Sequence, residues 1–132
     1  MQEQLEAVLS HTPVVLLDGA RQTGKTTLAR LAVEVRPTRY VTLDDAVVLD
    51  AARNDPAGFV AHTGGPVILD EVQRAPELFA AIKAEVDRQR QPGHFLLTSS
   101  ANILLIPKVS ELQAAGQMET LTLRPQIGRA HV

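Results

Sequence analysis

The chain has 132 residues, which suits one domain of ordinary size, and its 45% hydrophobic and 21% charged content excludes a wholly disordered protein. The net charge of -2 gives no general attraction to nucleic acid or to an anionic membrane surface. The absence of cysteine excludes a disulfide framework and a thiolate metal site, and it fits a reducing cytoplasm.

The amino-terminal half is predicted to alternate helices with apolar strands. Residues 2–9 fit a short amphipathic helix, and this segment lacks the basic start and apolar stretch of a signal peptide. No segment has the roughly 18 apolar residues of a membrane span, so we expect a cytoplasmic protein. Strands are predicted at 14–17, 39–43 and 67–69, and helices at 26–35, 46–53 and 56–62.

The carboxyl-terminal half continues the same alternation. A long helix is predicted over residues 77–91, with Pro76 at its first position. Further strands are predicted at 94–98 and 118–123, with a mostly helical segment at 103–112. Strands that alternate with helices and are apolar throughout are typical of a parallel sheet covered on both faces. We therefore predict an α/β protein with a three-layer α/β/α fold and a parallel sheet of about five strands.

A glycine-rich segment follows the first predicted strand. Gly19 to Thr26, "GARQTGKT", fits G-x-x-x-x-G-K-[ST] without a mismatch, and it opens a predicted helix as a phosphate loop must. Glycines let the backbone approach phosphate oxygens, the lysine reaches the β- and γ-phosphates, and the threonine hydroxyl ligates magnesium. The alternative is a flexible strand-to-helix turn whose sequence matches the phosphate-loop motif by chance. The candidate nucleotide-binding residues are Gly19, Ala20, Arg21, Gln22, Thr23, Gly24, Lys25, Thr26 and Thr27. Two of them have an alternative interpretation: Thr27 as a packing residue of the first helical turn, and Arg21 as a solvated loop residue.

Two carboxylates end the strand predicted at 67–69. Asp70 is assigned to magnesium, opposite Thr26, because an acid at such a strand end can hold the metal's water shell. Glu71 is assigned, with Lys25, to catalysis, because a second acid can polarise the water that attacks the γ-phosphate. The alternative is a pair of acids that only starts the next helix.

Polar residues also follow two other strands. In "LLTSSAN", Ser100 and Asn102 are candidates to contact the γ-phosphate and align water, although a Ser-rich turn that caps the next helix explains them as well. Asp44 and Asp45 could lie near the metal, but a cap for the helix at 46–53 is the favoured interpretation.

Taken together, these motifs resemble the AAA-type ATPases of the AAA_14 family. The similarity runs from Val14 to about Pro125 and rests on the phosphate loop, "LDD", "VILDEVQRAPELFAAIK" and "FLLTSSAN" in the family's order. It implies a P-loop NTPase fold, ATP as the nucleotide, Mg2+ as the metal, and a strand inserted between the two motif-bearing strands. It also implies a further C-terminal domain and a homo-oligomer in the full-length protein. No guanine-reading motif of the N/T-K-x-D kind is present.

The chain departs from the family pattern near its end. The resemblance places an arginine where Gln117 stands, and a basic group there could contact the γ-phosphate in the same chain or across subunits. We therefore expect hydrolysis to be impaired in this chain. The last residues, "IGRAHV" (127–132), are what a common sequencing adapter encodes, so we interpret residues 1–126 as a truncated ATPase domain and 127–132 as a non-native tail.

The sequence thus predicts a domain that binds ATP and hydrolyses it with magnesium, as the motor or switch part of a longer protein. A nucleotide-binding switch with negligible turnover is one alternative. A small-molecule P-loop kinase is another, although Glu71 beside Asp70 favours water over an acceptor. A DNA-interaction module has no support from the charge balance.

Overall fold

The computed structural model describes residues 1–20, 23–34 and 37–124 of the chain. Within these residues, five strands form one sheet whose order is β2-β3-β4-β1-β5, and every neighbouring pair is parallel. The strands are β1 (Val14–Asp18), β2 (Arg39–Thr42), β3 (Val67–Asp70), β4 (Phe95–Ser99) and β5 (Met118–Thr122). This arrangement confirms the predicted α/β fold with its parallel sheet.

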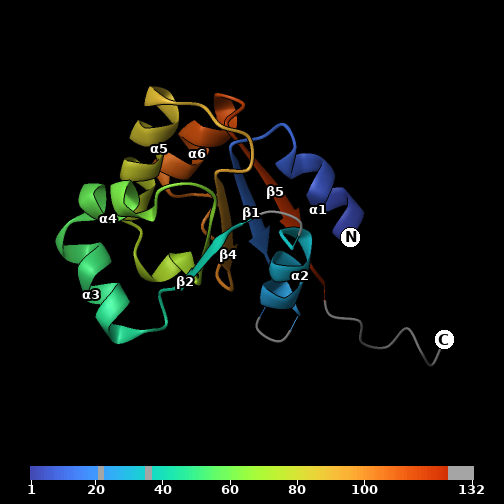
Figure 1. Ribbon diagram of the computed structural model, residues 1–132, viewed down its shortest axis with the longest axis horizontal. Coiled ribbons are helices and arrows are strands. Elements are labelled where there is room, and N and C mark those ends of the chain that lie inside the picture. The colour runs from blue at the N-terminus through green and yellow to red at the C-terminus, as the bar shows by residue number, and fades with distance from the viewer. Residues whose placement is uncertain (21–22, 35–36, 125–132) are drawn as a thin grey trace.

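Helices cover both faces of the sheet, so the molecule has three layers (Figure 1). The helices are α1 (Gln2–Leu9), α2 (Lys25–Ala32), α3 (Ala46–Asn54), α4 (Pro56–Thr63), η1 (Val72–Arg74, a 3-10 turn), α5 (Leu78–Arg88) and α6 (Pro107–Ala114). One apolar cluster packs α1 and α2 against one face of the sheet. A larger cluster packs α3, α4, α5 and α6 against the other face. No helix of the described part of the chain is long and apolar enough to cross a membrane.

The position of β1 inside the sheet explains why its sequence is apolar without interruption. Side chains alternate between the two faces of a strand, so each face of β1 contributes to a different cluster. Val14 and Leu16 belong to the larger cluster, whereas Val15 and Leu17 pack under α1 and α2. All four are fully buried. Burial on both faces therefore replaces the polar alternation of a half-exposed strand.

The strand order brings the candidate site together at one edge of the sheet. β4 lies between β1 and β3, as the family resemblance implied, with Leu17 opposite Thr98 and Leu69 opposite Leu97. Because the strands are parallel, their carboxyl ends meet at the same edge. The loop after β1, the carboxylates after β3 and the hydroxyls after β4 are therefore neighbours.

The predicted helix at 77–91 was too long, and the place given to Pro76 was wrong. The helix begins at Leu78 and ends at Arg88, and a 3-10 turn that the sequence analysis did not predict precedes it. Pro76 lies in a turn before the helix, where its carbonyl accepts a hydrogen bond from the Phe79 amide. At the other end Gln89 is extended, and Pro92 disfavours helix in the residue before it.

Two other helices are also shorter than predicted. The segment at 103–112 becomes helical only from Pro107, which is the first helical residue because proline has no amide hydrogen to donate inside a helix. The helix after the phosphate loop ends at Ala32, and Val33 has already left helical geometry. Residues 35–36 lie outside the described residues.

Candidate functional site

The glycine-rich loop joins β1 to α2 and ends in a glycine that the backbone requires. Gly24 has a φ of 86°, in the left-handed region that favours glycine, and α2 begins at Lys25. No side chain of the described residues caps the first turn of α2. Its free amide groups and positive helix end therefore suit an anion. Arg21 and Gln22 lie outside the described residues.

Gly19 is required because another backbone passes close to it. A Cβ atom at Gly19 would lie 2.6 Å from the carbonyl oxygen of Leu123, and the Leu123 amide donates to the Asp18 carbonyl at 2.7 Å. A contact of that length with backbone cannot be relieved by turning a side chain, so the loop or the end of β5 would have to shift.

We expect the Gly19→Ala variant to unfold at a lower temperature than the parent. Overpacking against backbone costs about 1–3 kcal/mol, which lowers Tm by roughly 5 °C or more in a domain of this size. Gly65→Ala is the matched control, because nothing lies within 4 Å of its Cβ position. A thermal melt followed by circular dichroism compares them, and an unchanged Tm for Gly19→Ala would contradict the close approach.

Lys25 is a buried cation that has no anionic partner among the residues that the structure describes. Lys25 is only 5% exposed, and its Nζ donates to the Ala20 carbonyl at 3.0 Å. Within the described ranges it forms no ion pair with a carboxylate. Burying an ammonium costs free energy unless a partner compensates it. The Lys25 ammonium therefore lacks a compensating anion among the described residues, and a phosphate group would supply one.

Asp70 accepts four hydroxyl hydrogen bonds. Thr26 and Thr98 donate to its Oδ1, at 2.8 and 2.7 Å. Tyr40 and Thr42 donate to its Oδ2, at 3.0 and 3.1 Å. Four donors fill the acceptor positions that a carboxylate offers. The predicted pairing of Asp70 with Thr26 is thus present, and donors from β2 and β4 complete it.

These donors keep Asp70 ionised. Burial by itself would raise the pKa of the Asp70 carboxyl, but hydrogen bonds to the charged form outweigh burial and hold its pKa below the usual range. Because a depressed pKa stabilises the folded state only above the pKa of the unfolded chain, this contribution is lost as the pH falls below about 4. At neutral pH the site therefore carries a fixed negative charge beside the Thr26 hydroxyl.

Tyr40 was missed by the sequence analysis. Its hydroxyl holds Asp70, and the Arg30 guanidinium of α2 lies 4.0 Å from its ring centroid, a cation–π contact. Burial, followed by the hydrogen bond to Asp70, raises the pKa of Tyr40, so it remains a donor at neutral pH. The sequence signal was limited to the spacing of Tyr40 and Thr42, which lie two residues apart and so share one face of β2. Their approach to Asp70 depends on the pairing of β2 with β3, which sets Thr42 opposite Asp70.

Glu71 takes a strained backbone conformation next to Asp70. Its φ is 57°, in the left-handed region, and its amide donates to the Thr98 hydroxyl at 2.9 Å. Its Oε1 accepts a hydrogen bond from the Ser100 hydroxyl at 2.8 Å. Non-glycine residues in this region are uncommon and cluster at functional sites. Ser100 is therefore brought to Glu71, as part of the same polar cluster.

Asp44 and Asp45 have separate roles. Asp45 caps α3, because its Oδ1 accepts from the amides of Val47 and Val48. Asp44 instead has a carboxylate oxygen within 4.8 Å of those of Asp70 and Glu71. Helix capping explains Asp45, as expected, whereas Asp44 lies in the acidic cluster, where Arg74 pairs with it at 2.6 Å.

Three other candidate residues lie at the edge of the cluster or outside it. Thr23 donates to the Ala20 carbonyl within the loop, and Thr27 is exposed on α2. Asn102 is exposed, and its side-chain oxygen accepts from the Leu104 amide. The turn interpretation therefore describes Asn102, while Ser100 lies in the cluster.

The idea that a basic group at position 117 would reach the γ-phosphate within the same chain was wrong. Gln117 precedes β5, and its carbonyl accepts from the Val14 amide at the start of β1. The phosphate loop follows the other end of β1, about four residues and roughly 13 Å farther along the strand. Gln117 instead donates to Asp87 at 2.8 Å. The presence of glutamine instead of arginine at position 117 therefore gives no reason to expect impaired hydrolysis within one chain.

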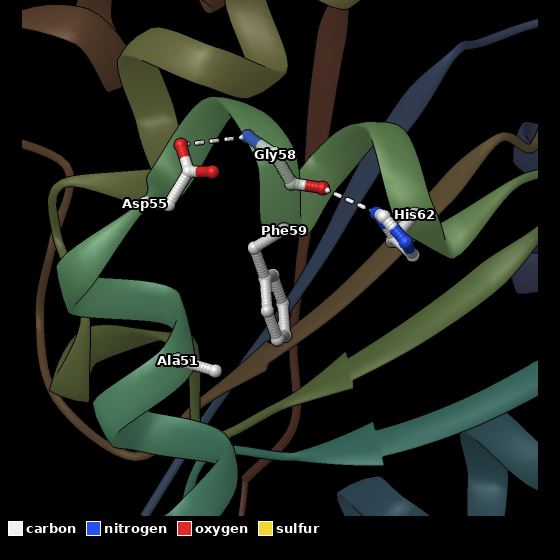
Figure 2. Close-up of a pocket in the computed structure, with 5 residues that line it drawn as sticks. All are labelled: Ala51, Asp55, Gly58, Phe59 and His62. Carbon is white, nitrogen blue, oxygen red and sulfur yellow. Dashed lines mark hydrogen bonds between the residues drawn. The ribbon is translucent and has the colours of Figure 1, made fainter.

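A pocket of about 340 Å³ lies between α3 and α4 and is lined by no residue of the phosphate loop that the structure describes (Figure 2). Its two polar side chains are used within their own helix: Asp55 accepts from the Gly58 amide at 3.0 Å, and His62 contacts the Gly58 carbonyl at 3.3 Å. The remaining lining is Ala51 and Phe59. This pocket gives no support to a phosphate-acceptor site.

Comparison with known proteins points to one family. The AAA_14 model, described as an AAA domain, matches residues 11–127. The uncharacterized proteins Mb2031c of Mycobacterium bovis and Rv2008c of Mycobacterium tuberculosis are each 40% identical over 121 residues. The match covers 91% of this chain and 27% of each relative, so the chain spans little more than a quarter of their length.

Solved structures share the fold. The Walker-type ATPase PABY2304 of Pyrococcus abyssi has a TM-score of 0.59 and 16% identity, over 94% of this chain and 52% of that one. A DNA replication initiation factor has a TM-score of 0.55 and 18% identity, over 91% and 43%. Identities this low show the fold alone, and it is that of P-loop ATPases.

Proposed function

The chain belongs to the AAA_14 family of AAA domains, and from this premise we propose that it binds ATP with magnesium and hydrolyses it. The observation that carries the proposal is the buried Lys25 ammonium, which has no carboxylate partner in the described residues and opens helix α2. A triphosphate supplies the missing negative charge at the place where backbone amides are also free.

Nucleotide binding would exchange one set of contacts for another. Lys25 would leave the Ala20 carbonyl, which it contacts at 3.0 Å, for the β- and γ-phosphates. Gly24 allows the loop backbone to come close to those oxygens, because it has no side chain and tolerates a φ of 86°. The loop therefore supplies both the charge and the directed donors.

The residues present fit a magnesium ion bound through oxygen. Thr26 offers a hydroxyl oxygen, and Asp70 lies behind it at 2.8 Å. Because four hydroxyls already occupy the Asp70 carboxylate, we assign Thr26 to the metal directly and Asp70 to the metal's water shell. When bound, magnesium would neutralise charge that develops on the phosphate oxygens.

Glu71 would act on the attacking water. Its carboxylate takes a proton from water, and the hydroxide oxygen forms a bond to the γ-phosphorus. The bond between that phosphorus and the bridging oxygen breaks, and ADP leaves with the electron pair. Two hydrogen bonds would fix the Glu71 carboxylate beside Asp70. The Glu71 amide donates to the Thr98 hydroxyl, and the Ser100 hydroxyl donates to Glu71 Oε1.

We further propose that this domain serves a longer protein. Its relatives are about four times as long as the matched region, which leaves room for further domains on which ATP turnover could act. Residues 1–126 would form the ATPase part, and 127–132 would not belong to it. The partner domain and any assembly into oligomers belong to this proposal.

Magnesium dependence gives the test of the proposed site. In isothermal titration we expect the parent to bind ATP about tenfold or more tightly with Mg2+ than with EDTA, a difference of about 1.4 kcal/mol per factor of ten. Asp70→Asn should lose most of this difference, because an amide cannot replace the carboxylate beside Thr26. Asp87→Asn is the matched control, since Asp87 is exposed on α5 and pairs with Lys83. No ATP binding by the folded parent would contradict the proposal.

A further inference from the structure

A glutamine follows Glu71 and contacts its carboxylate. Gln73 lies in the 3-10 turn η1, and its Nε2 donates to Glu71 Oε1 at 2.8 Å and to the Ser100 hydroxyl oxygen at 3.1 Å. The Ser100 hydroxyl donates a hydrogen bond to the same Oε1 at 2.8 Å. Three side chains thus form a closed triangle in which both donors point at one oxygen of Glu71.

The orientation of the Gln73 amide is fixed by Glu71. An ionised carboxylate can only accept hydrogen bonds, so an amide oxygen turned toward Glu71 would face another acceptor. The amide nitrogen therefore faces Glu71, and Gln73 Oε1 is left buried without a hydrogen-bond partner in the described residues. An unpaired buried acceptor costs free energy, so this orientation depends on the hydrogen bonds that the amide nitrogen donates to Glu71 and Ser100.

The two oxygens of Glu71 are consequently unequal. Oε1 accepts from Gln73 and Ser100, whereas the described residues give Oε2 no hydrogen bond. The backbone amide of Glu71 is anchored as well, because it donates to the Thr98 hydroxyl, which in turn donates to the Asp70 carboxylate. The arrangement holds one oxygen and leaves the other for a ligand.

We propose that Gln73 is a positioning residue for Glu71: it holds Oε1 so that Oε2 is the oxygen that takes the proton from the attacking water. The inference rests on the proposed hydrolysis of ATP and names a residue that acts through Glu71. A loose carboxylate would spend much of its time turned away from the water, and misplacement by about 1 Å can cost up to about a hundredfold in rate.

The test is the Gln73→Met variant, which keeps the length of the side chain and removes both amide donors. We expect kcat for ATP hydrolysis to fall about tenfold and the KM for ATP to change less than twofold, because the Gln73 amide donates to Glu71 and Ser100 and to none of the described residues of the phosphate loop. Gln113→Met is the matched control: its amide is exposed on α6 and donates to Thr120. An unchanged kcat, or a KM that rises as much as kcat falls, would overturn the proposal.

A double variant separates positioning from other effects. If Gln73 acts through Glu71, adding Gln73→Met to Glu71→Gln should cause no further loss of residual turnover. A second tenfold loss would show that it acts independently of Glu71, against the proposal.

A parent without turnover would defeat the proposed function, and the contact would still be tested by unfolding. For Glu71→Ala and Gln73→Met, a double-mutant cycle should give a coupling of about threefold or more in the unfolding equilibrium constant. Additive effects would refute the positioning contact.

Discussion

Replacing Glu71 by glutamine should leave ATP binding nearly unchanged and slow hydrolysis about a hundredfold or more. Glutamine keeps the shape of the side chain but cannot take a proton from water, and general-base catalysis contributes roughly 10²–10⁴-fold. Because Glu71 lies beside Asp70 and not against Lys25, the binding contacts should persist. Phosphate release at saturating ATP and titration of the variant measure the two effects separately.

Glu111→Gln is the control for this variant. Glu111 is exposed on α6 and pairs only with Lys108 among the charged groups of the described chain. It should behave as the parent in both assays. Turnover by Glu71→Gln at the parental rate would remove Glu71 from the mechanism, whereas loss of ATP binding would mean that the residue holds the site together instead.

The Lys25→Ala variant should bind ATP at least about tenfold more weakly than the parent. It removes the only charge of the loop that the structure describes, and with it a charge-assisted contact to phosphate. The variant should not lose stability without nucleotide as a core truncation would, because it also removes a buried, uncompensated ammonium.

Lys108→Ala controls for the loss of a lysine, since Lys108 is exposed and lies on α6. Isothermal titration with ATP and magnesium compares the three proteins. An affinity for Lys25→Ala equal to that of the parent, in a protein that is still folded, would show that the loop does not hold the phosphates.

The part of the site that could be predicted from the sequence lies within one continuous segment of the chain. The loop from Gly19 to Thr26 is one continuous segment in which each residue type has a geometric reason, so its pattern is readable without a fold. The parallel sheet followed from burial on both faces of β1. Once strands are parallel, the meeting of Thr26 with Asp70 at one edge follows from topology.

The remaining contacts of the site depend on which strands are neighbours. Tyr40 and Thr42 reach Asp70 only because β2 pairs with β3 in a register that sets Thr42 opposite Asp70. Gln73 reaches Glu71 because the chain forms a 3-10 turn after the strand instead of a helix. The misplacement of Gln117 has a different origin. A residue that precedes a strand of a parallel sheet lies at the amino-terminal edge, away from the phosphate loop, and the predicted parallel sheet already implied this.

Single-turnover phosphate release, with protein in excess over ATP, tests whether the phosphate loop and the carboxylates after β3 hydrolyse ATP, because slow turnover still registers. We expect phosphate release by the parent that requires Mg2+, with little release by Glu71→Gln at ATP concentrations where the nucleotide is bound. Bound ATP that stays intact in the parent with Mg2+, or release at the same rate by both proteins, would contradict it.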